Sequence, residues 1–181
     1  MTDKEPVAER LLTADETPAT AWAAARERLE APNTYWLATV RPDGRPHVVP
    51  LLAIWLDNTL YFCASGASRK AKNLELDSHC VLSANSLTLP ALDLVLEGSA
   101  VKVNDDTTLQ RVADAYKVMM DWPVTVRDGG FYGDSAPTAG PPPYYVYEFT
   151  PTVAFGLPGT AGTDSAGQGP AGMITPTRWH F

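Results

Sequence analysis

The stretch from Tyr35 to Leu56 reads Tyr-Trp-Leu-Ala-Thr-Val-Arg-Pro-Asp-Gly-Arg-Pro-His-Val-Val-Pro-Leu-Leu-Ala-Ile-Trp-Leu. Residues 35–40 and 47–56 are rich in the aromatic and branched side chains that favour strands. Between them, Asp43-Gly44 is a sequence typical of tight hairpin turns. We therefore predict a β-hairpin whose strands run from Tyr35 to Val40 and from His47 to Leu56.

Working outward from this hairpin, the sequence alternates short strand patterns with three helical ones. The apolar phase of the strand predicted over 93–103 slips by one residue at Gly98, which indicates a β-bulge. Short antiparallel strands with inserted helices predict a mainly β fold with α additions, a small β-barrel. The other predicted strands are 59–63, 81–84, 144–149 and 153–155. The predicted helices are 18–32, 70–76 and a third that Asp105 or Asp106 would cap.

The length of 181 residues fits one compact domain. We expect a flexible N-terminal lead over 1–17 and one folded domain over 18–157. Residues 158–181 are expected to form a Gly/Pro-rich linker and a C-terminal tail. Because the tail ends in Arg178-Trp-His-Phe181, whose two aromatic rings are poorly placed in water, we expect it to dock on the domain.

Charge and cysteine content exclude several classes of partner. Acidic residues outnumber basic ones by 21 to 14, a net charge of −7, which argues against a nucleic-acid partner. No apolar stretch has the length of a membrane span or a signal peptide, so we expect a cytoplasmic protein. Cys63 and Cys80 are expected to be free thiols. His79 beside Cys80 has no further ligands at usable spacing, so no metal site is expected.

The segment Ala64-Ser-Gly-Ala-Ser-Arg-Lys-Ala-Lys72 concentrates Arg69, Lys70 and Lys72 where a strand gives way to a helix. Helix-start N–H groups, serine hydroxyls and paired cations are suited to binding a phosphate. A second interpretation stays open, in which the cations form a solvated helix face and pair with Glu75 and Asp77.

The hairpin, the following strand and the Ser68-Arg-Lys-Ala71 junction, in this order and spacing, resemble the pyridoxamine 5′-phosphate oxidase-like split-barrel family of flavin and deazaflavin oxidoreductases. The resemblance covers residues 33–104 well and the remainder more loosely. The phrases Trp36–Pro46 and Pro176–Phe181 resemble the actinobacterial deazaflavin branch. The resemblance implies an antiparallel split barrel with flanking helices, and a homodimer with the cofactor between its subunits.

The resemblance also implies a set of cofactor contacts. Arg69 and Lys70 match the pair that holds the cofactor phosphate, with Ser68 before them and Lys72 and Asn73 in the helix that completes the pocket. Ala64 and Ser65 match a strand end that faces the cofactor. The second hairpin strand matches the positions beneath the cofactor ring, which here are His47, Val49, Pro50 and Leu51.

Two departures bear on the activity. Pyridoxamine phosphate oxidases carry a flavin-contacting lysine where this chain reads Ala53-Ile-Trp55, and they end in a longer Arg- and His-bearing signature. Oxidation of vitamin B6 is therefore not expected, and the assignment of FMN as the cofactor is weakened. We expect an oxidoreductase that transfers hydride between the deazaflavin coenzyme F420 and a small organic substrate. An FMN enzyme of the same fold, or a non-catalytic flavin- or haem-binding protein with His47, His79 or His180 as a haem ligand, remains the alternative.

Several single residues stay open. His47 is either a hydrogen-bond donor beside the cofactor ring or a structural histidine. Trp179 either covers the cofactor or merely seals the barrel or the dimer. Tyr116, Trp122 and Tyr132 are expected to serve packing, with a substrate cavity as the alternative. Because the cofactor would carry the chemistry, no catalytic residue is assigned, and the substrate is expected to contact loops 85–92 and 123–143.

Overall fold

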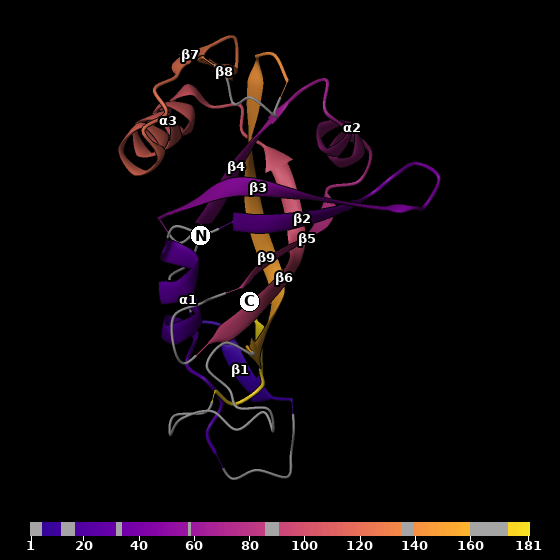
Figure 1. Ribbon diagram of the computed structural model, residues 1–181, viewed down its shortest axis with the longest axis vertical. Coiled ribbons are helices and arrows are strands. Elements are labelled where there is room, and N and C mark those ends of the chain that lie inside the picture. The colour runs from indigo at the N-terminus through magenta and orange to yellow at the C-terminus, as the bar shows by residue number, and fades with distance from the viewer. Residues whose placement is uncertain are drawn as a thin grey trace.

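The computed structural model describes residues 5–11, 17–31, 34–57, 59–85, 91–134, 140–159 and 174–181, and Figure 1 shows how their strands and helices are arranged. The strands are β1 (Val7–Arg10), β2 (Thr34–Val40), β3 (Pro46–Leu56), β4 (Thr59–Ser65), β5 (His79–Asn85), β6 (Leu92–Lys102), β7 (Thr125–Arg127), β8 (Gly130–Tyr132), β9 (Tyr144–Pro158) and β10 (Thr177–His180). The helices are α1 (Trp22–Glu30), α2 (Arg69–Leu76) and α3 (Asp106–Met120).

Six strands form a closed antiparallel barrel in the order β9-β4-β3-β2-β5-β6, and the pairing of β6 with β9 closes it. The other four described strands are attached to β9. β10 and then β1 extend the sheet from one half of β9, while β8 and β7 extend it from the other. The predicted mainly β split barrel with flanking helices is thus confirmed.

The β-bulge predicted at Gly98 is present where β6 pairs with β9. Glu97 lies opposite Val153 and Gly98 opposite Pro151, so the register shifts between the two residues. A Cβ atom at position 98 would lie 2.9 Å from Pro151 Cα, and still closer to the carbonyl oxygen of Thr150. Glycine is required here because the backbones approach too closely for a side chain, and the bulge lets the sheet bend round to close.

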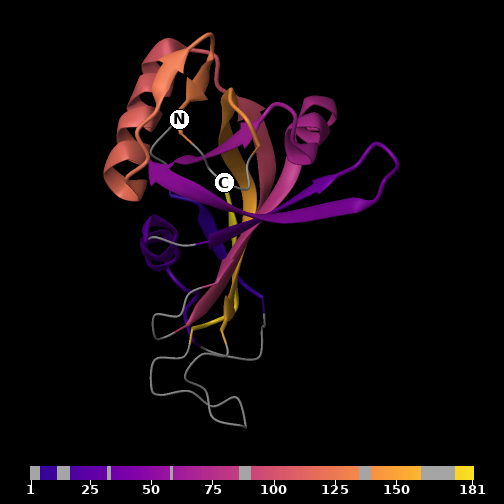
Figure 2. The same ribbon diagram turned by 45° about the horizontal axis from the view of Figure 1, so that its top comes forward.

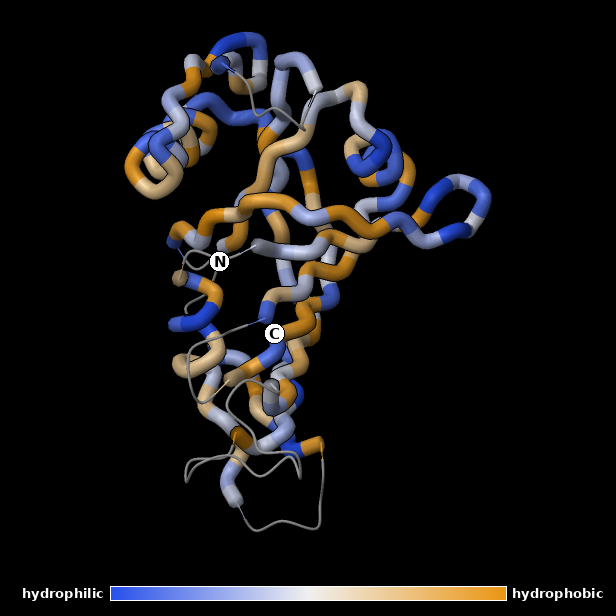
Figure 3. The backbone as a smooth tube through the Cα atoms, in the orientation of Figure 1, coloured by the Kyte–Doolittle hydropathy of each residue, from blue (hydrophilic) through white to orange (hydrophobic). Residues whose placement is uncertain are grey.

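The β2–β3 hairpin projects from the barrel, as both views show (Figures 1 and 2). Residues 46–52 of β3 pair only with β2, because β4 joins β3 from Ala53 onward. We call residues 39–47, which extend beyond the pairing with β5, the hairpin arm. Its turn is hydrophilic, whereas the strands behind it are largely hydrophobic (Figure 3). The hairpin therefore places apolar side chains, among them Trp36, Val48 and Leu52, in exposed positions.

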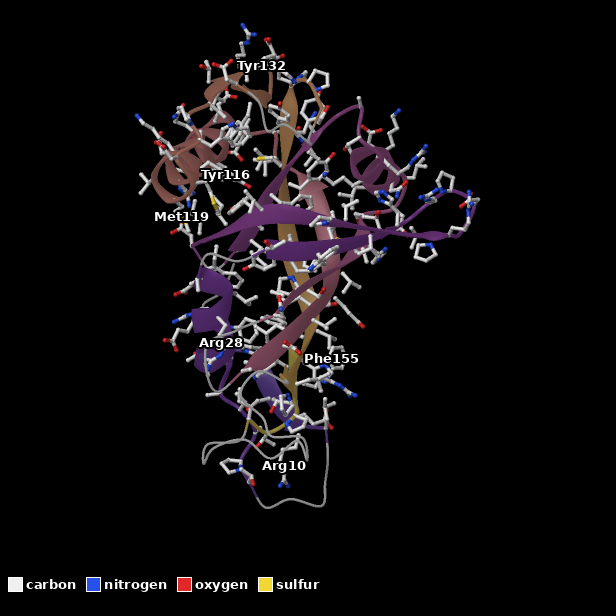
Figure 4. All side chains as sticks on the ribbon, in the orientation of Figure 1. Arg10, Arg28, Tyr116, Met119, Tyr132 and Phe155 are labelled. Atoms are coloured by element: carbon white, nitrogen blue, oxygen red, sulfur yellow. The ribbon has the colours of Figure 1, made fainter. Side chains whose placement is uncertain are left out.

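The helices cover the two ends of the barrel (Figure 1). In α1 the buried residues Trp22, Ala25 and Leu29 lie on one face, which packs on the main core. In α3 the Asp105 carboxylate accepts the Thr108 N–H at 2.8 Å and so caps the helix. Beneath α3 lies a second apolar cluster that includes Tyr116, placed between the helix and the barrel strands in Figure 4.

The two chain ends pair with each other, because β1 runs antiparallel to β10. Trp179 in β10 is fully buried, donates from Nε1 to the Thr20 carbonyl oxygen at 3.1 Å, and packs edge-on against Trp22. The strand at Val7–Arg10 differs from the flexible lead expected over 1–17, since its partner lies about 170 residues away in the sequence. Residues 1–4 and 12–16 of that lead, and 160–173 of the expected linker, lie outside the described residues.

The segment expected as a loop over 123–143 contains the short β7–β8 hairpin. None of the helices in the described ranges is both long and apolar enough to cross a membrane.

Gly98→Val is expected to lower the free energy of unfolding by about 1–3 kcal/mol, because the new side chain would overlap the β9 backbone. Urea unfolding followed by circular dichroism measures the change. Ser99→Ala on the same strand is the control and should stay within about 0.5 kcal/mol of the parent. A Gly98→Val protein as stable as the parent would show that the bulge does not require glycine.

Candidate functional site

The site is built around the junction between β4 and α2. Ser68 is the N-cap of α2: its hydroxyl accepts the Ala71 N–H at 3.3 Å, and its own N–H donates to the Ser65 carbonyl oxygen at 2.9 Å. A helix start presents several N–H groups without intrahelical partners and favours negative charge. The Ser68 side chain accepts a hydrogen bond from one of these N–H groups and so stabilises the junction.

Residues 140–145 hold this junction in place from outside. The Ser65 hydroxyl donates to the Pro141 carbonyl oxygen at 2.9 Å. Gly66 lies against the Tyr145 ring, where an added Cβ would come within 2.8 Å of ring atom Cε2. The Lys102 ammonium lies 3.2 Å from the centroid of the same ring, in cation–π contact. Both Ser65 and Gly66 are thus fixed by contacts with β9 and the loop before it.

The predicted cations differ in their surroundings. Arg69 and Lys72 are exposed at the first turns of α2, whereas Lys70 is half-buried. Burial lowers the pKa of the Lys70 ammonium, and the neighbouring Cys63 thiol acts in the opposite direction. Cys63 and Cys80 are both free, and burial raises the pKa of each thiol to about 12.

Arg41 joins this group although the sequence did not single it out. It is half-buried at the base of the hairpin turn, and its Nε atom is buried without a hydrogen-bond partner among the described residues. Its backbone N–H donates to the Arg45 carbonyl oxygen at 2.9 Å, which closes the turn. We call Arg41, Arg69, Lys70 and Lys72 the cation cluster. The sequence offered one indication of Arg41: it directly follows the predicted strand that ends at Val40 and lies opposite the predicted return strand.

No member of the cation cluster forms an ion pair with a carboxylate that the structure describes. The alternative interpretation paired these cations with Glu75 and Asp77. Asp77 instead contacts His79, at 2.7 Å from its Nδ1 atom. The cluster therefore presents positive charge that no described carboxylate neutralises, within an acidic chain.

His47 lies in the electric field of the cluster. Its half-buried ring contacts the Thr39 hydroxyl at 3.5 Å from Nδ1. Burial lowers the pKa of His47 below its ordinary value of 6.5, and the charges of Arg41, Lys70 and Arg69 lower it further. The imidazole is therefore neutral at neutral pH.

The predicted residues of β3 divide between two faces, because successive side chains of a strand point to opposite sides. His47, Val49 and Leu51 lie on the face of the barrel interior, and all three are half-buried. Pro50 lies opposite Trp36 on the outer face and is exposed. The structure thus brings three of these four residues to the side on which α2 packs.

Three further predicted residues serve the interior of the protein. Ala64 is fully buried in the main core. Asn73 is only 1% exposed and donates from Nδ2 to the Thr39 hydroxyl at 2.9 Å, which ties α2 to β2. Trp179 packs at the end of the barrel that α1 covers, away from α2, so the structure does not bring it to the cation cluster. A terminal aromatic ring gains more from burial in a core than from an exposed position.

Within the described ranges, no group of three or more His, Cys, Asp or Glu side chains is arranged to hold a metal ion. His79 and His180 each lie beside a carboxylate, of Asp77 and Glu9 respectively, on the protein surface.

Residues 21–156 match the family model for pyridoxamine 5′-phosphate oxidase. The chain belongs to that family. The matched range contains the whole barrel apart from the end of β9, together with the cation cluster and His47, so the family assignment covers the candidate site. A comparison with curated proteins finds no significant match.

Solved structures share the fold of this pyridoxamine 5′-phosphate oxidase family member. An F420 reductase is 25% identical with a TM-score of 0.52, over 71% of this chain and 94% of the other. A putative pyridoxamine 5′-phosphate oxidase from Listeria innocua is 18% identical with a TM-score of 0.56, over 75% and 96%. A heme binding protein from Mycobacterium smegmatis is 18% identical with a TM-score of 0.57, over 87% and 57%.

His47 is expected to titrate below the value of about 6.5 that is typical of free histidine. Lys70→Ala should raise its midpoint, because removing a nearby positive charge makes protonation of the ring easier. NMR titration of the ring protons measures both. Lys72→Ala is the matched control and should leave the midpoint unchanged, since Lys72 is not among the charges acting on His47. Equal responses to the two variants would contradict the arrangement described.

Proposed function

We propose that this member of the pyridoxamine 5′-phosphate oxidase family is an oxidoreductase that binds the deazaflavin coenzyme F420 and transfers hydride between it and a small organic substrate. The observation that carries the proposal is the cation cluster, none of whose members forms an ion pair with a carboxylate in the described part of the chain. In a protein of net charge −7, such a local concentration of positive charge is suited to an anionic ligand. The family's association with flavin-type cofactors supplies the class of that ligand.

The residues present fit the phosphate of such a cofactor. Arg69 and Lys70 would hold the phosphate together with the first N–H groups of α2. Arg41 would approach from the hairpin arm, where its buried Nε atom lacks a partner among the described residues. When bound, the coenzyme supplies the hydride chemistry itself.

The remaining groups would orient the ring system and exclude water from it. Val49 and Leu51 offer apolar surface on the inner face of β3, and His47 offers a polar contact beside them. The junction from Ser65 to Ser68 is fixed by its hydrogen bonds before any ligand arrives, which reduces the cost of ordering it on binding.

We further propose that the functional unit is a homodimer that covers the outer apolar face of the hairpin. Trp36, Val48 and Leu52 lie on this face and are 47%, 54% and 54% exposed. Pro50 lies between them, directly opposite Trp36. Monomeric proteins seldom expose large rings and branched side chains side by side. A second copy would bury them and complete the cofactor pocket, as the family resemblance implies.

Titration of the purified protein with F420 and, separately, with FMN tests the cofactor. We expect tighter binding of F420, followed by fluorescence, and Arg69→Ala and Lys70→Ala should each weaken it. Loss of a charged hydrogen bond costs about 1.5–3 kcal/mol, or roughly ten- to a hundredfold in Kd. Lys117→Ala, an exposed cation on α3, is the control and should bind as the parent does.

Preference for FMN would assign the FMN alternative of the same fold. If neither cofactor binds, or if Arg69→Ala and Lys70→Ala bind as well as Lys117→Ala, the cation cluster is a solvated surface and the proposal fails.

Sedimentation velocity tests the dimer. The parent protein should sediment at twice the mass of one chain, and Val48→Asp should sediment as a monomer because a charge would be buried in the interface. Val118→Asp is the control: this residue is 84% exposed on α3, outside the β2–β3 hairpin, and its variant should remain a dimer. A monomeric parent protein at micromolar concentration would refute this assembly.

A further inference from the structure

A short chain of polar side chains runs from α2 through β2 to β3. Asn73 Nδ2 lies 2.9 Å from the Thr39 hydroxyl oxygen. That oxygen lies 3.4 Å from the carbonyl oxygen of His47 and 3.5 Å from its ring atom Nδ1. Asn73 and Thr39 are 1% and 2% exposed, so bulk water does not compete for these groups.

The numbers of donors and acceptors in these side chains determine which group donates each hydrogen bond. The amide nitrogen of Asn73 can only donate, so the Thr39 oxygen accepts from it. The single hydroxyl hydrogen of Thr39 must then be donated elsewhere, and both acceptors within reach belong to His47: its carbonyl oxygen and, in one tautomer, its ring atom Nδ1. When the hydroxyl donates to Nδ1, that nitrogen carries no hydrogen, so the hydrogen of the neutral imidazole resides on Nε2.

We propose that Asn73 and Thr39 are positioning residues that hold neutral His47 in its Nε2–H form, so that it presents a hydrogen-bond donor beside Arg41, Arg69 and Lys70. Nε2 makes no hydrogen bond to any residue that the structure describes. The expected acceptor is an oxygen atom of the bound cofactor, and only this last element rests on the proposed function.

The surrounding charges support a neutral ring. Arg41, Lys70 and Arg69 all oppose its protonation, and burial acts in the same direction. An imidazole that stays neutral offers one donor and one acceptor, so its function depends on which nitrogen holds the hydrogen. Because the tautomer is already fixed in the ligand-free protein, the ring does not have to change tautomer when a ligand binds. This role also explains why an asparagine in the middle of α2 is buried rather than exposed.

Long-range ¹H–¹⁵N NMR spectra of the ligand-free protein at pH 8 report the tautomer of each ring directly. We expect His47 to show an unprotonated Nδ1 and a protonated Nε2. His79 and His180 serve as internal references, and His47→Gln assigns the signals by removing them. Because no cofactor is present, the result is independent of whether F420 or FMN binds.

Thr39→Val removes the hydroxyl while keeping the shape of the side chain. It should shift the ratio of the two His47 tautomers about fivefold toward Nδ1–H, the equivalent of one ordinary hydrogen bond. Thr39→Ser retains the hydroxyl and should restore the parent ratio. A loss of packing alone would not be repaired by serine, since serine lacks the methyl group.

Two results would overturn the inference. One is a parent protein with hydrogen on Nδ1, which would mean either that Thr39 donates to the His47 carbonyl oxygen instead or that the Asn73 amide is turned round. The other is a tautomer ratio that Thr39→Val leaves unchanged. Should Thr39→Val fail to fold, the spectrum of the parent protein alone decides between the two tautomers.

Discussion

The pairing of β9 with β6 closes the barrel, and the positions of the remaining elements depend on it. β9 is fifteen residues long and pairs with β4, β6, β8 and β10 at different points along its length. A flat strand of this length would diverge from its twisted neighbours. The bulge at Gly98 removes that conflict, because it lets β6 follow β9 through the bend. With the barrel closed, the start of β9 is placed where Tyr145 supports the junction between β4 and α2.

Closure also explains why the hairpin arm and α2 meet. β2 passes between β3 and β5 within the barrel, so the arm leaves the barrel wall at a fixed place and direction. α2 follows β4 directly and is tied to β2 by the hydrogen bond from Asn73 to Thr39. Arg41 from the arm and Arg69 and Lys70 from α2 then act on the same imidazole. Repulsion among these cations is a cost to the ligand-free fold, which an anionic ligand would relieve.

Local features of the fold could be predicted from the sequence. The Asp43-Gly44 turn, the phase slip at Gly98 and the cap at Asp105 each depend on a few neighbouring residues, and each is found. β1 could not be predicted, because its four residues lack a strand pattern and gain their hydrogen bonds from β10 at the far end of the chain. The three-residue strands β7 and β8 could not be predicted either, because each is too short to show a strand pattern in a Gly-rich segment.

The residues of the candidate site also differ in how far the sequence alone can identify them. Sequence reasoning singled out Arg69, Lys70 and His47 because cations at a helix start and a histidine in a strand can be recognised locally. It missed Arg41, whose role depends on where the arm projects, and it could not tell that Asn73 faces β2 rather than solvent. The docked position of Trp179 depends on Trp22 and Thr20, which lie more than 150 residues earlier in the chain.

The contact between Trp22 and the aromatic residues at 179 and 181 has a consequence for synthesis on the ribosome. α1 is among the first elements to emerge, yet part of the apolar face that it turns toward the barrel is completed by β10. Until residues 177–181 have left the exit tunnel, Trp22 has neither of these rings to pack against. The barrel strands can pair earlier and bring Trp55 to Trp22, but this end of the core is completed only when residues 177–181 have also emerged. During translation Trp22 therefore lacks two of its three described aromatic neighbours until more than 150 further residues have been made.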